Sequence, residues 1–293
     1  MAWGAAWITI ADEQKDGQQL DRHIMFRLRQ IIRAIVSVSA LSAWFNAGLG
    51  RALAAMAKTP PIVAAASSLR FALQDAANSF AGETGATVRL SFGSSGNLVR
   101  QIRQGAPFEL FLSADEDYAH GLARDGFTRD EGILYALGQL VIIAPNGSPL
   151  HLDAQLSGLR SALGRGGIQR FAIANPEHAP YGRAAREALI HAGLWDAIQP
   201  SLVLGENVSQ AAQFTVSGSC EGGMIARSLA MSPGYAGRGR YETISAGFHR
   251  PLHQRMILLN GAGKTARAFY RYLQGPAAGE IFVRHGFAEP GKG

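Results

Sequence analysis

The residues best placed to do chemistry in this chain are two pairs of serines, Ser67-Ser68 and Ser94-Ser95. Each pair follows an apolar stretch that predicts a strand, from Ile62 to Ala66 and from Thr87 to Phe92, and each precedes a helical pattern. At such a junction serine hydroxyls and the free N–H groups of the helix start point out of the sheet together. Two junctions aimed at one point would hold an anion without any cationic side chain. The opposing interpretation is that each serine merely caps its helix, which is worth about 1 kcal/mol.

The elements that must position these serines alternate between strand and helix along the chain. Further strands are predicted at Phe108–Leu112, Leu140–Ala144, Phe171–Ala174, Ser201–Leu204, Gly222–Ala226 and Arg255–Leu259. Helical patterns follow most of them after short turns, which is typical of a parallel, helix-covered sheet. Because this order of strand, short turn and helix recurs in both halves of the chain, we expect an α/β protein of two lobes, with the ligand in the cleft between them.

Composition limits the classes of function. The 293 residues carry a net charge of +6, but the basic residues are scattered without a stripe, so we expect no nucleic-acid partner. The one cysteine, Cys220, excludes an internal disulfide, and the eight histidines show no metal-binding spacing. We therefore expect neither a cofactor nor a resident metal.

The N-terminal region has the pattern of an export signal. From Met25, arginines precede an apolar run that ends in the small-residue motifs Ala52-Leu53-Ala54 and Ala55-Met56-Ala57. Residues 25–57 are thus predicted to be a signal peptide within a dispensable extension of residues 1–57. The run is shorter than the roughly 20 residues of a membrane span. We expect a periplasmic mature protein; whether translation starts at Met1 or Met25 stays open.

Five segments, taken in order, resemble the molybdate-binding periplasmic proteins of ATP-driven (ABC) transporters. They read AAASSLRFALQDAANSF, SFGSSGNLVRQI, GAPFELFLSAD, ANPEHAPYGRAAREAL and FYRYLQGPAAGEIFVRHGF, and they extend over most of the region 62–288. The resemblance implies the type II periplasmic binding protein fold, with two α/β lobes that each contain a mainly parallel sheet. We predict lobe 1 at residues 58–141 plus 249–290 and lobe 2 at residues 142–248.

The resemblance also implies a ligand set. Ser68 and Ser95 match serines that donate hydroxyl and N–H groups to the oxyanion, while Tyr181 and Val208 match positions that donate backbone N–H groups. Molybdenum would be bound only as molybdate, through these four residues. Ser67, Ser94 and Asn207 are expected to hold these four residues in position without binding the oxyanion themselves.

One position departs from the family pattern. Some members carry a ligand tyrosine where this chain has Ala226, and a small residue where it has Tyr181. The phenol of Tyr181 therefore stands as a candidate replacement, and whether Tyr181 binds through its hydroxyl or only through its N–H stays open.

The implied function is capture of molybdate, and of tungstate with it, by a monomer that delivers it to an ABC transporter permease in the inner membrane. A related alternative is another tetrahedral oxyanion such as sulfate or phosphate. A remote alternative is a secreted hydrolase, which the sequence does not favour because it lacks an arranged Ser-His-Asp set.

Overall fold

The computed structural model describes residues 59–291, and its helices and strands lie in one compact unit that begins at Pro60. The predicted signal peptide lies outside the described residues. The strands are β1 (Ile62–Ala66), β2 (Arg89–Gly93), β3 (Phe108–Ser113), β4 (Ile133–Gly138), β5 (Leu140–Pro145), β6 (Phe171–Ala174), β7 (Leu202–Gly205), β8 (Gly222–Ala226), β9 (Gly239–Thr243) and β10 (Leu252–Leu258). The longer helices are α2 (Arg70–Thr84), α3 (Ser95–Arg103), α4 (Glu116–Arg124), α5 (Ser157–Gly164), α6 (Pro180–His191), α8 (Val208–Val216), α10 (Lys264–Tyr272) and α11 (Pro276–Arg284). Short helices are η1 (Ser67–Leu69), α7 (Trp195–Ile198), η2 (Gln199–Ser201), α9 (Arg227–Ala230) and η3 (Ala246–Phe248).

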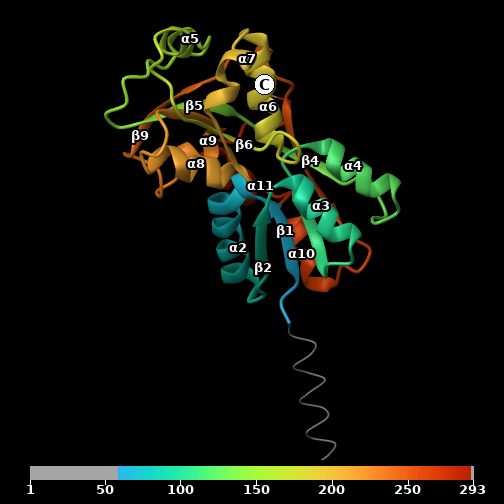
Figure 1. Ribbon diagram of the computed structural model, residues 1–293. Helices are drawn as coiled ribbons and strands as arrows, with labels where there is room; N and C mark the ends of the chain where they lie inside the picture. The colour runs from blue at the N-terminus through green and yellow to red at the C-terminus, as the bar shows by residue number, and fades with distance from the viewer. Residues whose placement is uncertain (1–58, 292–293) are drawn as a thin grey trace, which may run out of the picture. The chain divides into compact units, whose positions relative to one another are not determined.

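The strands form two sheets of five, in the orders β2-β1-β3-β10-β4 and β7-β6-β8-β5-β9. We call the part of the chain built on the first sheet the first lobe, and the part built on the second sheet the second lobe. Each sheet is mixed. Strands β1, β2 and β3 pair in parallel, as do β6, β7 and β8, whereas β10 and β5 join their neighbours antiparallel. The predicted two-lobed fold is confirmed, with antiparallel strands added to each parallel core (Figure 1).

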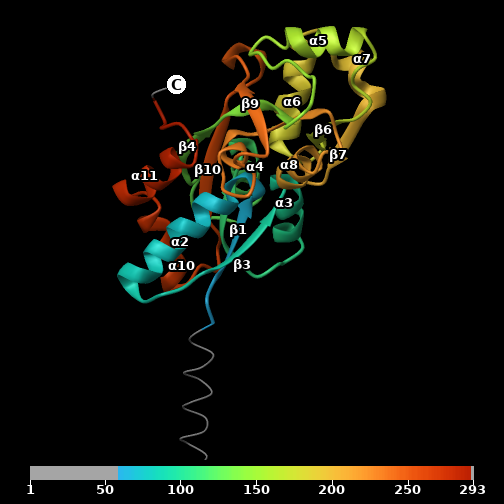
Figure 2. The same ribbon diagram turned by 90° about the vertical axis from the view of Figure 1, so that its left-hand side faces the viewer.

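The first sheet is covered on both faces because its side chains alternate. Val63 and Ala65 of β1 face the buried side of α2, whereas Ala64 packs with Leu98 of α3 on the other side. Figure 2 shows α2, α10 and α11 together on one side of this sheet. In the second lobe, α6 and α8 pack on β6 and β8. The serine junctions are thereby fixed at the ends of β1, which is largely buried, and of β2, the partly exposed edge strand that pairs with it.

The chain passes between the sheets at two places, which form the hinge region. Strand β4 ends at Gly138 and β5 begins at Leu140, and the return passes from β9 through η3 to β10. The lobe boundaries predicted at 141/142 and 248/249 stay a prediction, with β5 starting two residues before the first of them.

Each strand predicted from the sequence is present, but two strands were not predicted. Strand β4 was hidden because Ile133 to Ala144 is one nearly continuous apolar run, which the structure divides at Gln139. Strand β9 carries the polar sequence GRYET at the sheet edge, where apolar residues are not needed. Residues 183–197 have the pattern of a single helix, but α6 begins earlier, at Pro180, and a turn at Gly193 separates it from α7.

Candidate oxyanion-binding site

A small cavity lies where four helical segments begin, two from each lobe. It contains about 190 Å³ of space between atoms. The residues that line it are Ala66, Ser67, Ser68, Gly93, Ser94, Ser95, Ala114, Ala179, Pro180, Tyr181 and Val208. The structure therefore brings Ser68, Ser95, Tyr181 and Val208, the four residues predicted from the sequence, to one point. None of the lining residues carries a charge.

The first lobe contributes two buried hydroxyls. Ser68, in η1, is 2% exposed and its Oγ has no hydrogen-bond partner in the described part of the chain. Ser95, the first residue of α3, is fully buried, and its Oγ accepts the N–H of Ala114 at 3.1 Å. Since that oxygen already accepts a bond, its proton is free to be donated into the cavity.

The second lobe contributes two helix starts. Pro180 and Tyr181 are the first residues of α6, and Val208 is the first residue of α8. The N–H groups of a first helical turn have no partner within their helix. Asn207 accepts the N–H groups of Ser209 and Gln210 as the N-cap, so it fixes the start of α8 without being a lining residue.

Tyr181 has the largest side chain of the residues that line the cavity, and this side chain ends in a hydroxyl. The side chain is 1% exposed, and its oxygen has no hydrogen-bond partner among the described residues. Burial raises the pKa of this phenol far above its ordinary value, while Ser68 acts in the opposite direction. The Ser68 hydroxyl therefore lies beside the phenol, although the two do not meet the geometry of a hydrogen bond. A neutral phenol is a donor, which suits an anion.

The lobes are in direct contact around the cavity. On one side, Ser209 donates its hydroxyl to the carbonyl of Ser67 at 3.0 Å, and Ser228 donates to the carbonyl of Ser68 at 2.8 Å. On the other side, the Nδ1 atom of His178 lies 2.9 Å from the Ser94 hydroxyl. Ser67 and Ser94 thus support the site by joining the lobes.

Two further pairs join the lobes at the outside of the cleft. Asp115 of the first lobe forms an ion pair with Arg183 of α6, and Asn97 donates to Glu206 at 2.5 Å. The Arg183 guanidinium also lies 5.4 Å from the centroid of the Tyr118 ring. The sequence around Asp115 has the pattern of a solvent-exposed helix face, but the Asp115 side chain is only 17% exposed and pairs across the cleft.

Several residues at this site were not singled out by sequence reasoning. Ser209, Ser228 and His178 close the cleft, and no local pattern distinguishes such serines from other helix-start serines. The sequence indicated the region of Gly96 but not its role, because this glycine lies in the SFGSSGN segment beside Ser94 and Ser95. Its N–H donates to the carbonyl of His178 at 2.9 Å. A Cβ at Gly96 would lie 2.8 Å from that carbonyl oxygen, so the close approach of the lobes requires glycine.

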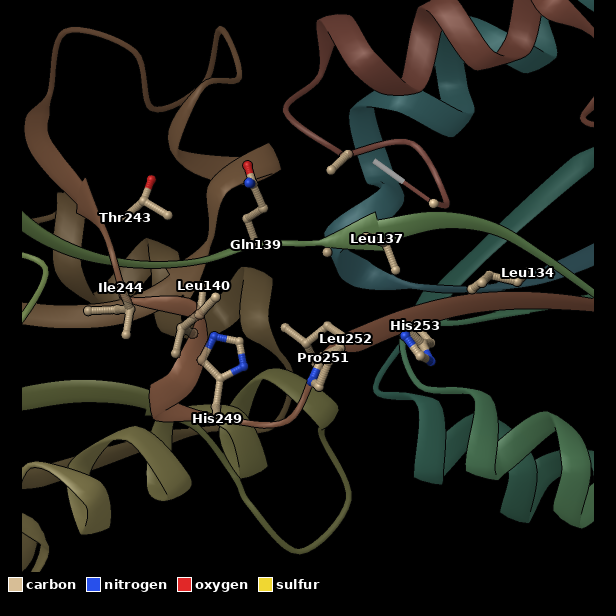
Figure 3. Close-up of a pocket in the computed structure, with 14 residues that line it drawn as sticks. Leu134, Leu137, Gln139, Leu140, Thr243, Ile244, His249, Pro251, Leu252 and His253 are labelled. Carbon is tan, nitrogen blue, oxygen red and sulfur yellow. The ribbon is translucent and has the colours of Figure 1, made fainter. Parts of the chain in front are cut away.

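A larger pocket lies at the hinge region, away from the serine junctions. It contains about 1140 Å³ of space between atoms, against about 190 Å³ for the serine cavity, and Figure 3 shows that Leu137, Gln139 and Leu140 line it opposite His249 and Pro251. The lining is mainly aliphatic and contains neither a serine pair nor a long helix start, which makes it unsuited to a dianion. We therefore take the smaller, polar cavity as the functional site.

Other candidate sites have a structural explanation. Cys220 is buried, and burial raises the pKa of its thiol, which lowers its reactivity. Among residues 59–291, no three His, Cys, Asp or Glu side chains are arranged to hold a metal ion. Within the same range no helix is both long and apolar enough to cross a membrane.

Two α/β lobes that close on a small polar cavity define a solute-binding protein of the two-lobed type. A family model described as bacterial extracellular solute-binding protein matches residues 62–288. The chain is 34% identical to the molybdate-binding protein ModA of Azotobacter vinelandii over 256 residues, 86% of this chain and 98% of that protein. It is 37% identical to ModA of Escherichia coli K12 over 260 residues, 83% and 97% of the two chains.

Solved structures agree with these relatives. The periplasmic molybdate-binding protein of A. vinelandii aligns with a TM-score of 0.71 at 31% identity, covering 78% of this chain and 99% of that one. The sulfate-binding protein SubI of Mycobacterium tuberculosis aligns with a TM-score of 0.65 at 15% identity, a likeness of fold alone. The chain belongs to the bacterial extracellular solute-binding protein family.

Proposed function

We propose that this protein captures molybdate, and tungstate with it, outside the cytoplasm and delivers it to the permease of an ABC transporter. The observation that carries the proposal is that Ser68, Ser95, Tyr181 and Val208 meet at one uncharged cavity, where two buried hydroxyls have no hydrogen-bond partner among residues 59–291. The names of the relatives from A. vinelandii and E. coli point to the same ligand. The protein acts as a monomer and uses no cofactor.

Neutral donors are sufficient to hold such an anion. Molybdate is a tetrahedral dianion, and each of its four oxygens accepts hydrogen bonds. A hydrogen bond to a charged group contributes about 1.5–3 kcal/mol, so the hydroxyl and N–H groups of Ser68 and Ser95, with N–H groups from Tyr181 and Val208, offset its desolvation. The starts of α3, α6 and α8 add the positive ends of three helix dipoles.

Selection against sulfate then depends on size. Sulfate has the same shape and charge but shorter bonds, so a cage fitted to molybdate leaves it with longer, weaker hydrogen bonds. A cage of backbone N–H groups at helix starts adjusts little to a smaller ion. An arginine in the site would add affinity while discriminating poorly by size, and none lines this cavity.

The proposal is tested by titrating the protein with molybdate, tungstate, sulfate and phosphate, with binding measured by calorimetry and by intrinsic fluorescence. Molybdate and tungstate should bind at least about a hundredfold more tightly than the other two, which corresponds to one or two well-made charged hydrogen bonds. Sulfate or phosphate that binds as tightly as molybdate would favour the alternative that another tetrahedral oxyanion is the ligand. Absence of binding by any of the four would refute an oxyanion function.

The hydrolase alternative has one feature that can be tested separately. Ser94 and His178 lie at hydrogen-bond distance, as a nucleophile and a base would, but both side chains are engaged in joining the lobes. An esterase assay with the wild-type protein and with Ser94→Ala is decisive. Hydrolysis that Ser94→Ala abolishes would support the enzyme; we expect none in either protein.

A further inference from the structure

Behind the cavity, the hydroxyl of Tyr181 reaches the hinge region. Among the described residues, four buried polar side-chain atoms in this area have no hydrogen-bond partner: Tyr181 OH, Ser68 Oγ, Gln254 Oε1 and Tyr135 OH. Burial raises the pKa of the Tyr135 phenol, and the neighbouring Tyr181 raises it further, so the two phenols are close enough to interact. Buried polar groups are normally paired, so a cluster of unpaired ones points to a function.

Gly138, the last residue of β4, makes room for that hydroxyl. A Cβ at position 138 would lie 2.4 Å from the Tyr181 oxygen and 2.7 Å from the Nε2 atom of Gln254. Both distances are too short for any side chain, and the backbone of Gly138 has a negative φ that other residues adopt. The need for glycine is therefore one of space, and the space is taken by the phenol and the amide.

Gln254 comes from β10, the second strand of the hinge region, and is fully buried. Its Nε2 donates weakly to the carbonyls of Ala114 at 3.3 Å and Leu252 at 3.5 Å. The N–H of Ala114 in turn donates to Ser95 Oγ. Gln254 is thus close to proposed donors from both lobes. It contacts Ala114, which contacts Ser95, and it lies beside the space at Gly138 that the phenol of Tyr181 occupies.

We propose that Gly138 and Gln254 are positioning residues that direct the hydroxyl of Tyr181 onto the bound oxyanion. A phenol oxygen both donates and accepts. When Gln254 turns one Nε2 hydrogen from its weak contact with the Leu252 carbonyl, at 3.5 Å, to the phenol oxygen, the proton of the phenol is left for the anion. This inference rests on the proposed oxyanion function and identifies which residues make Tyr181 a side-chain ligand.

A double-mutant cycle separates this role from a purely structural one. Calorimetry with sodium molybdate is run on wild type, Gln254→Met, Tyr181→Phe and the double variant. One hydrogen bond corresponds to about two- to tenfold in affinity, so Gln254→Met should lose that much in the wild-type background. In the Tyr181→Phe background it should lose less than about twofold, because there is no hydroxyl left to position.

Glycine 138 provides an independent cycle. Gly138→Ala should weaken molybdate binding by displacing the hydroxyl, and Tyr181→Phe should relieve that effect because it removes the oxygen that meets the new methyl group at 2.4 Å. Gly247→Ala, at a hinge-region glycine with nothing within 4 Å of the added Cβ, is the matched control and should bind as wild type. Thermal unfolding without ligand checks that each variant is folded.

A pH profile adds a readout that packing alone would not change. Gln254→Glu keeps the shape of the amide, but an ionised carboxylate cannot donate, whereas a protonated one can. Its affinity for molybdate should therefore recover as the pH is lowered from 8 to 6, with wild type measured in parallel. A flat profile, or equal losses for Gln254→Met in both backgrounds, would overturn the inference.

The outcomes distinguish this inference from the function on which it rests. If wild type binds molybdate and Tyr181→Phe binds it equally well, the phenol is not a ligand, and the inference fails while the proposed function stands. If a buried water rather than Gln254 orients the phenol, Gln254→Met is silent and the inference also fails. If wild type binds no oxyanion, both fail together.

Discussion

The Nδ1 atom of His178 lies 2.9 Å from the hydroxyl oxygen of Ser94, so the second lobe closes directly on a serine pair of the first. The same histidine accepts the N–H of Gly96 through its carbonyl. Ser94 precedes Ser95 in the chain, and His178 precedes Tyr181 by three residues. Closing the cleft and assembling the proposed ligand set are therefore one structural event.

Truncation of the serines tests the site itself. Ser68→Ala and Ser95→Ala each remove a hydroxyl but leave the backbone N–H, so each should lose one charged hydrogen bond. The expected loss is about 1.5–3 kcal/mol, or roughly ten- to a hundredfold in molybdate affinity by calorimetry. Val208→Ala is the matched control, because only its N–H is used, and should change little. Wild-type affinity in both serine variants would place the site elsewhere.

The side chain of His178 should hold the closed form. His178→Ala removes its contact with Ser94 but keeps the carbonyl that accepts from Gly96. We expect dissociation of molybdate, followed by stopped-flow fluorescence, to become about two- to tenfold faster, as for the loss of one neutral hydrogen bond. His151→Ala, whose side chain is 80% exposed, should leave the rate unchanged. An unaltered rate in His178→Ala would mean that the Ser94 contact does not stabilise closure.

Closure of the lobes can be blocked at one glycine. Gly96→Ala places a Cβ 2.8 Å from the backbone oxygen of His178, which cannot move without separating the lobes. Small-angle scattering should show that wild type becomes more compact with molybdate and that Gly96→Ala does so less. Gly82→Ala, in α2 with open space around it, is the control. Equal compaction of wild type and Gly96→Ala, or none in wild type, would contradict a hinge motion of this kind.

The sequence predicts the local part of this architecture well and the long-range part poorly. Ser68 and Ser95 can be found because strand, serine pair and helix are contiguous, and the periodicity of Leu98, Val99 and Ile102 identifies a helix. Gly138 and Gln254 could not be found, because their role depends on two hinge strands that meet a phenol from the other lobe. Nothing in the spacing of residues 138, 181 and 254 encodes that contact.

The predicted signal peptide is tested by the natural N-terminus of the exported protein. The apolar run and the motif Ala55-Met56-Ala57 predict cleavage such that the mature chain begins between Ala55 and Lys58. N-terminal sequencing of the periplasmic fraction should give this start, and a chain that begins at Met25 should be exported equally well. A stable cytoplasmic product that keeps Met1 would contradict this prediction.

Glu116 should make stability depend on pH. Partial burial alone would raise the pKa of this carboxyl, but hydrogen bonds and positive charge from His253 and Arg255 outweigh it and hold the pKa below its ordinary value of 4.5. The carboxylate lies 2.5 Å from His253 Nδ1 and 3.0 Å from an Arg255 guanidinium nitrogen, both on β10. It therefore links the start of α4 to a hinge strand.

A carboxyl whose pKa is lower in the folded than in the unfolded protein stabilises the fold above the unfolded pKa. This contribution is complete above about pH 4.5 and is lost as the pH falls through the folded value. Chemical denaturation should thus show Glu116→Gln less stable than wild type at pH 7, with the difference shrinking as the pH falls below 4.5. Glu177→Gln, at a side chain that is 80% exposed, should have the same free energy of unfolding as wild type at each pH. A Glu116→Gln deficit that persists unchanged to pH 3 would mean that packing of the side chain, rather than its charge, stabilises this junction.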